Sequence, residues 1–361
     1  MKRYYHAVRR PVRRPRADEY LLLTLLSFAL SVSLTRLFLE LTGYPQLGGG
    51  TLHIAHMLWG GLLLFIATLL PLIFANRWVY WVEALMAGVG VGLFIDEVGK
   101  FITQSNDYFY PPAAPIIYAF FLICVLVYLQ LNRSPSRHAR AELYAALEMM
   151  EDVLDHDLDA RERAEIEARL RFVVEQKNHP ELAHLADQLL NYVIEEQIYI
   201  APPPPDYLKR LETKLLALEM RYLDRSRFRA ALALGLSVLG LASVITASRL
   251  IASSLEPGSI GLTFRFVIES IRNPSYSFVY WFFILQVVQG LFGLLLMAGA
   301  VLLVTGRERQ GVRYSYFALL VYLTMVNLLM FYYYQFSTII SAIIQFALLL
   351  AVMYYRQRFL S

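Results

Sequence analysis

Seven charged or titratable side chains lie near the ends of three long apolar runs in the first third of the chain: Arg36, Glu40, His53, His56, Asp96, Glu97 and Lys100. Histidine changes its charge near neutral pH, and histidine and carboxylate side chains are common metal ligands. Arginine and lysine add fixed positive charges that stabilise nearby carboxylates. These residue types therefore indicate proton transfer, ion binding or metal chemistry.

Helical spacing predicts that some of these groups meet. Asp96 shares one stripe with Gly88 and Gly92, at every fourth position, and small residues let a second helix approach closely. His56 shares a face with Gly60 on the preceding apolar run. If the two faces with small residues pack together, His56 lies beside Asp96. We therefore predict that these two side chains are within hydrogen-bond distance or share a bound ion.

Three interpretations of these residues follow. In the leading one, they form an outward-facing ion or proton site of a transporter or another ion-handling protein, because titratable groups at membrane depth are usually functional. In the second, His53, His56 and Asp96 hold a divalent metal ion that activates water, in an intramembrane metal-dependent enzyme. In the third, the charges form interfacial ion pairs such as Asp96 with Lys100. The protein is then a non-catalytic sensor or scaffold, whose partner is a cytoplasmic protein or a second copy of the chain.

The elements that position these residues are predicted membrane spans. Hydrophobic residues make up 57% of the 361 residues and charged residues 17%, against about 25% in soluble proteins. This composition excludes a single large water-soluble enzyme. A span needs about 20 apolar residues, and we predict eight spans. They are residues 20–41, 52–74, 78–102, 113–131, 229–253, 278–304 and two more within 314–355, which we expect to turn back at 332–337.

Basic residues predict the orientation of the spans. Seven Lys or Arg residues precede Asp18, and further arginines follow the second, fourth, sixth and eighth spans. Because such residues favour the cytoplasmic side, we expect a cell-membrane protein with both termini in the cytoplasm. The basic N-terminal tail then lies beside the lipid bilayer, and we predict no nucleic-acid partner.

Residues 132–228 have the composition of a helical cytoplasmic domain. Asp159 followed by Glu162 is typical of a helix start with a capping box. Two apolar helix faces are expected here, one of Leu143, Leu147, Met150 and Leu154, and one of Ile166, Leu170 and Val173. Neither Gly nor Pro occurs from 206 to 234, which predicts a helix that continues into the fifth span.

The two groups of four spans resemble each other in sequence. Arg36 aligns with Arg249, His56 with Gln289, and Gly60 with Gly293. We therefore predict an all-α fold of two parallel four-helix repeats with the helical domain inserted between them. The expected divisions are a basic tail at 1–19, the first repeat at 20–131, the cytoplasmic domain at 132–228 and the second repeat at 229–361.

Overall fold

The computed structural model describes residues 11–43, 55–105, 107, 110–132, 137–176, 179–195, 198–202, 224–254 and 277–360. It is 85% helical, with no strand among these residues, so the all-α prediction is confirmed. The chain divides into two compact units. The first comprises residues 1–97 and 123–210, and the second comprises residues 98–122 and 211–361.

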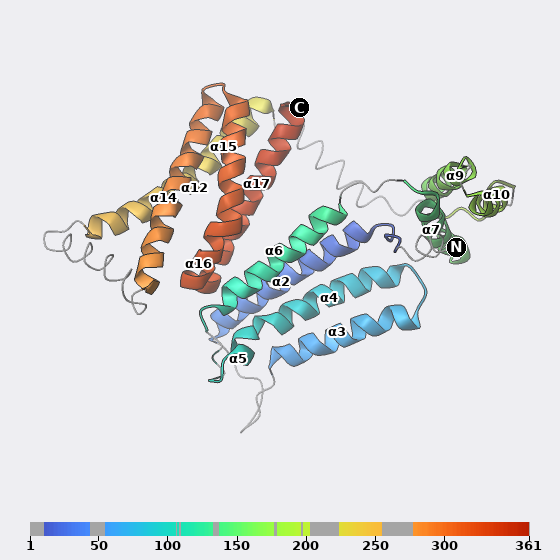
Figure 1. The fold of residues 1–361 in the computed structure, drawn as a ribbon, viewed down its shortest axis with the longest axis horizontal. Helices are drawn as coiled ribbons and strands as arrows, with labels where there is room; N and C mark the ends of the chain where they lie inside the picture. Colours follow the sequence, from blue (N-terminus) through green and yellow to red (C-terminus); the bar gives the residue numbers. More distant parts are fainter. Residues whose placement is uncertain are drawn as a thin grey trace, which may run out of the picture. The chain divides into compact units, whose positions relative to one another are not determined.

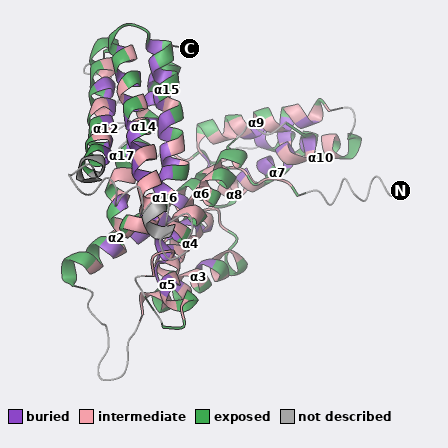
Figure 2. Cartoon of the chain, turned by 60° about the vertical axis from the view of Figure 1, so that its left-hand side comes forward, coloured by how far each residue is buried: buried purple, intermediate pink, exposed green. Residues whose placement is uncertain are grey.

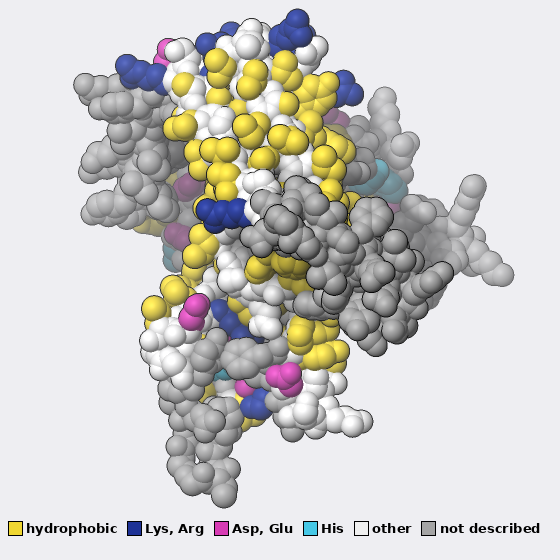
Figure 3. All heavy atoms as spheres, turned by 90° about the vertical axis from the view of Figure 1, so that its left-hand side faces the viewer, with side chains coloured by type: hydrophobic (Ala, Val, Ile, Leu, Met, Phe, Trp, Pro, Cys, Tyr) yellow, Lys and Arg dark blue, Asp and Glu magenta, His cyan; other side chains and the backbone are white. Residues whose placement is uncertain are grey.

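Seven helical segments of the described residues are long and apolar enough to cross a membrane: α2 (Ala17–Thr42), α3 (His56–Ile73), α4 (Trp78–Asp96), α6 (Ala113–Leu131), α12 (Arg225–Ser254), α14 (Ser277–Val304) and the segment Glu308–Phe359. Large apolar side chains on them face outward, including Leu26, Leu30 and Leu34 of α2. Exposed and buried residues occur on the same helices (Figure 2), and hydrophobic side chains cover much of the face in Figure 3. Apolar surface this extensive suits lipid, which indicates a multi-pass membrane protein.

In the first unit, α4 packs against both α2 and α3 (Figure 1). Gly88 and Gly92 of α4 lie against serines of α2, while Gly90 faces Gly60 of α3. A β-carbon added to Gly60 would lie 2.7 Å from the Gly90 carbonyl oxygen, so the two backbones are in close contact. The stripe of Gly88, Gly92 and Asp96 therefore packs against α2, and the adjacent side of α4 packs against α3.

The first unit also contains a small helical domain: α7 (Ala139–Met149), α8 (Glu151–Leu154), α9 (Ala160–Val174) and α10 (Pro180–Glu195). The capping box of Asp159 and Glu162 is confirmed at the start of α9. The predicted apolar face of α9 is buried, but the predicted face of α7 is wrong, because Leu147 and Leu154 are exposed. The α7 residues in the core of this domain are Ala139, Leu143, Ala146 and Met149, and α7 packs against α9 and α10.

The second unit contains α5 (Val98–Ile102), α12 and α14, followed by α15 (Glu308–Val321), a π-helical turn η2 (Tyr322–Val326), α16 (Asn327–Tyr334), a 3₁₀ turn η3 (Gln335–Thr338) and α17 (Ile339–Phe359). α14 packs against α12 and α15, and α17 packs against α15 and α12. The chain reverses at η3, where Gln335 has a positive φ of 48°, so that α17 runs back along α15 (Figure 1). This turn lies within the predicted range 332–337.

The parallel repeat is not confirmed, because helices of the two halves pack in different orders. Gly60 of α3 contacts Gly90 in the following helix, whereas its aligned residue Gly293 of α14 contacts Gly240 in the preceding helix. The repeat therefore stays a prediction. The eight crossings and the four domain boundaries also stay predictions. The predicted continuation of the cytoplasmic domain into the fifth span involves residues 206–223, which lie outside the described residues.

Candidate functional site

Asp96, the last residue of α4, is held by Arg36 of α2. The Arg36 Nε donates a hydrogen bond to Asp96 Oδ1 at 2.5 Å, and Nη2 donates to the Asp96 backbone carbonyl at 2.9 Å. The Asp96 side chain has no exposed surface, and that of Arg36 is 5% exposed. A buried carboxylate needs such a partner, and a cation at a helix C-terminus also interacts favourably with the helix dipole. Arg36 thus neutralises Asp96 and stabilises the end of α4.

His56, the first residue of α3, contacts the other carboxylate oxygen of Asp96. Its Nε2 lies 3.1 Å from Asp96 Oδ2. The predicted proximity of His56 and Asp96 is therefore confirmed. The His56 side chain is 21% exposed, whereas Asp96 is fully buried. A titratable side chain that reaches the surface thus contacts a carboxylate that does not.

Glu97 is placed against the start of α3. It is buried, and the backbone N–H of Met57 donates to Glu97 Oε2 at 3.4 Å. The first N–H groups of a helix lack partners within the helix and carry partial positive charge, so a carboxylate is favourable there. We define the polar cluster as Arg36, His56, Asp96 and Glu97. It joins the C-terminal part of α2, the start of α3 and the end of α4.

The definition of the cluster leaves out the other three predicted site residues. Glu40 is exposed on α2 and makes none of the hydrogen bonds described for the cluster. Lys100 belongs to α5 in the second unit. His53 lies outside the described residues.

The predicted metal site of His53, His56 and Asp96 stays a prediction, because His53 lies outside the described residues. No group of three potential His, Cys, Asp or Glu ligands occurs in the described part of the chain. Both Asp96 oxygens already have partners, one of them the Arg36 guanidinium. A divalent cation bound to Asp96 would be repelled by this fixed positive charge.

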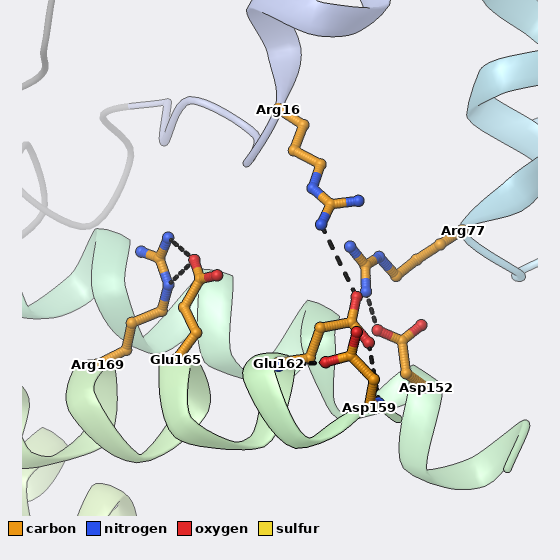
Figure 4. A network of polar contacts seen from close by, with 7 residues as sticks. All are labelled: Arg16, Arg77, Asp152, Asp159, Glu162, Glu165 and Arg169. Atoms are coloured by element: carbon orange, nitrogen blue, oxygen red, sulfur yellow. Dashed lines mark hydrogen bonds and ion pairs between the residues drawn. The ribbon is translucent and has the colours of Figure 1, made fainter. Parts of the chain in front are cut away.

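A second polar contact surface lies at the other end of α4. Arg77, immediately before α4, pairs with Asp152 of α8, and Asn76 Nδ2 donates to Asp155 Oδ2 at 2.9 Å. Figure 4 shows Arg77 and Arg16 pointing from the membrane helices towards Asp152 and Glu162 of the helical domain. α4 has 19 residues and therefore spans about 28 Å between this surface and Asp96.

Burial raises the pKa of Asp152 to about 6, and the charges of Glu162 and Asp157 add to this effect. Arg77 and Arg16 act in the opposite direction, since a neighbouring positive charge favours the carboxylate. Asp152 is thus a carboxyl group that titrates close to neutral pH where the helical domain meets the membrane helices.

No protein-family model, curated protein or solved structure matches this chain. Its functional residues are therefore identified from the geometry and chemistry of the site. A set of buried amide and hydroxyl side chains in the second unit was not predicted as a site from the sequence. The available signal was the alignment of Gln286 and Gln289 with His53 and His56, which places polar residues at corresponding positions in an apolar helix.

Proposed function

We propose that this protein moves protons, or couples ion movement to protonation, through the polar cluster of Arg36, His56, Asp96 and Glu97. One observation carries the proposal: the partly exposed His56 lies 3.1 Å from the fully buried Asp96. Histidine is the residue type whose charge changes most readily near neutral pH. A proton taken up at His56 is therefore delivered next to a carboxylate in the protein interior.

The shared carboxylate provides a way to convert protonation into helix movement. When His56 is neutral, the charges of Arg36 and Asp96 cancel. Protonation adds a positive charge to His56 and strengthens its hydrogen bond to Asp96. Arg36 then has to share its counterion, so α3 is held more tightly to α4 while α2 is held less tightly. Such an exchange of ion pairs is one way to alternate between two helix arrangements.

The proposed topology has eight crossings, with both termini in the cytoplasm and the polar cluster near the outer side. Two features support it. The reversal at Gln335 divides the segment Glu308–Phe359 into two arms, 308–334 and 339–359, each long enough to cross a bilayer. Arginines also concentrate in the segments that this topology assigns to the cytoplasm.

A sensor or scaffold function is the second candidate, and the ion pairs of Arg77 and Arg16 with the helical domain favour it. A cytoplasmic protein or a second copy of the chain that bound this domain would act directly on the start of α4, beside Arg77. This function does not require His56 to be titratable. Substitution of His56 therefore distinguishes the two candidates.

Reconstitution into liposomes that contain a pH-sensitive dye tests the proposal. After a membrane potential is imposed, the wild-type protein should acidify or alkalinise the lumen faster than protein-free liposomes. The H56Q variant keeps a polar side chain but cannot take up a proton, so it should lose at least about 90% of this flux, since a positioned proton-transfer group contributes 10²-fold or more. The matched control H184Q changes an exposed histidine of α10 and should retain the flux. Equal flux from H56Q and wild type would contradict the proposal.

A further inference from the structure

A layer of buried, uncharged polar side chains crosses the second unit. Each is at most 7% exposed, and we define the polar layer by its members: Ser243, Gln286, Gln289, Tyr322, Asn327 and Gln345. They come from α12, α14, η2, α16 and α17. Gln289 lies near the middle of the 28-residue α14. If α14 crosses a bilayer, this layer lies near the middle of the membrane.

Hydrogen bonds within the layer connect these helices. The hydroxyls of Ser243 and Tyr322 lie 3.1 Å apart, and Tyr322 also hydrogen-bonds with Gln289. The Asn327 Nδ2 donates to Gln345 Oε1 at 2.8 Å. Polar residues inside a membrane bundle are costly unless they are bonded, and they commonly mark a substrate or ion path.

Three oxygens of the layer are buried without a hydrogen-bond partner among the described residues. They are Oε1 of Gln286, Oε1 of Gln289 and Oδ1 of Asn327. Leaving a buried acceptor unsatisfied costs about 1–3 kcal/mol, so three in one region require an explanation. Turning an amide over exchanges its oxygen and nitrogen but still leaves one polar end unpaired. These side chains therefore need a partner that the described part of the chain does not supply.

The backbone is also irregular at this layer. The N–H of Asn327 bonds to the carbonyl of Tyr322, five residues back, and not to that of Leu323. The Leu323 carbonyl accepts a hydrogen bond of 2.6 Å from the Tyr118 hydroxyl of α6. Such π-helical turns are frequent at functional sites, and irregular backbone at membrane depth is tolerated where it is buried in protein or lines a cavity. The turn redirects Asn327, whose oxygen is one of the three without a partner.

We propose that the polar layer binds a monovalent alkali cation, sodium or potassium. Neutral oxygens replace the hydration shell of such ions in known selectivity filters, and unpartnered amide oxygens supply the same kind of ligand. Gln286 and Gln289 lie three residues apart on one face of α14, and the Oε1 atoms of both have no partner among the described residues. Divalent cations usually require carboxylate ligands, and none of the six layer residues is acidic. This site is separate from the polar cluster and does not depend on it.

Thermal unfolding of the full-length protein in detergent tests this proposal. At constant ionic strength, replacing choline chloride by sodium or potassium chloride should raise the Tm in a saturable manner, because a ligand that binds only the folded state stabilises it. The double substitution Q286M/Q289M removes two oxygens at similar side-chain length and should abolish this dependence. The control Q310M changes an exposed glutamine of α15 and should leave the dependence intact.

Direct binding keeps the proposal testable if the double variant fails to fold. Wild-type protein should bind ²²Na⁺ saturably, or should bind Tl⁺ in a manner that potassium displaces. The H56Q variant should bind as wild type does, so failure of proton flux would leave this site unaffected. Absence of saturable binding and of any Tm difference between sodium, potassium and choline would show that the layer holds only water. Loss of cation binding in H56Q would place the ion at the polar cluster, and either result would overturn the proposal.

Discussion

Arg36 holds the end of α4 through two bonds to the single residue Asp96, one to its side chain and one to its backbone carbonyl. The two residues are 60 positions apart in sequence. Asp96 is the last residue of α4 and also contacts His56, the first residue of α3. Its contacts therefore hold the C-terminal part of α2, the start of α3 and the end of α4 together. The proposed proton chemistry depends on that arrangement.

Removing Arg36 should be strongly destabilising. The R36A variant leaves a buried carboxylate with its cation missing, and breaking one side of a buried ion pair typically costs 3–5 kcal/mol. The double variant R36M/D96N removes both charges and should recover much of the loss in Tm measured in detergent. R309A, at an exposed arginine, serves as the control. A Tm for R36A within 1 °C of wild type would show that Asp96 does not need this partner.

Close contact between α3 and α4 should make Gly60 sensitive to a single methyl group. A β-carbon at this position would lie 2.7 Å from the Gly90 carbonyl and from the Phe94 nitrogen. G60A should therefore lower stability by about 1–3 kcal/mol, the usual cost of overpacking. The neighbouring Gly61 has nothing within 4 Å of an added β-carbon, so G61A is a matched control. If both variants unfold at the same temperature, the helices are not in backbone contact.

The raised pKa of Asp152, about 6, predicts a pH dependence of known sign. In the unfolded chain this group titrates near 3.9, so between roughly pH 4 and 6 the folded state binds its proton more tightly. The contribution to stability is therefore fully present below about pH 4 and is lost as pH rises through 6. D152N should remove this component when Tm is followed from pH 4.5 to 7.5. D187N, at an exposed aspartate of α10, should behave as wild type. A D152N profile parallel to that of wild type would exclude a raised pKa.

Cysteine labelling tests the proposed topology. In a C124A background, which removes the single native cysteine, we expect Q104C to react with an impermeant thiol reagent on intact cells. S136C should react only after the membrane is permeabilised, because the Arg distribution places it in the cytoplasm. Labelling of S136C in sealed cells would overturn the eight-crossing topology.

Sequence periodicity predicted which helix faces carry the site residues better than it predicted which side chains form ion pairs. The spacing of Gly60 on α3 and of Gly88 and Gly92 on α4 predicted that His56 reaches Asp96, and this contact is confirmed. The packing behind it differs from the prediction, because the stripe with Gly88 and Gly92 lies against α2 and Gly90 on the adjacent side faces Gly60. The same reasoning favoured pairs within one helix, such as Asp96 with Lys100. Arg36 was among the predicted site residues, but its pairing with Asp96 was not predicted, because nothing in the spacing along α2 indicates which residue of another helix it meets.

Two other features show where the sequence signal ends. The predicted face of α7 is wrong because the buried side of the helix includes the small residues Ala139 and Ala146, and Leu147 lies outside it. The helix also ends at Met149, before Leu154. The polar layer was missed because single amides in long apolar runs form no periodic pattern. Only the packing of α12, α14 and η2 brings Ser243, Gln289 and Tyr322 together.

Proton flux as a function of pH tests the central claim most directly. Liposomes that contain wild-type protein, H56Q or D96N are compared between pH 5 and 8 under the same imposed potential. The proposed role predicts that wild-type flux changes within this range, because histidine is the residue type whose charge changes near neutral pH, and that both variants lose the flux and its pH dependence. D96N protein must retain a helical spectrum for the comparison. Wild-type flux with an unchanged pH profile in folded H56Q would contradict the claim that the His56–Asp96 pair carries the proton.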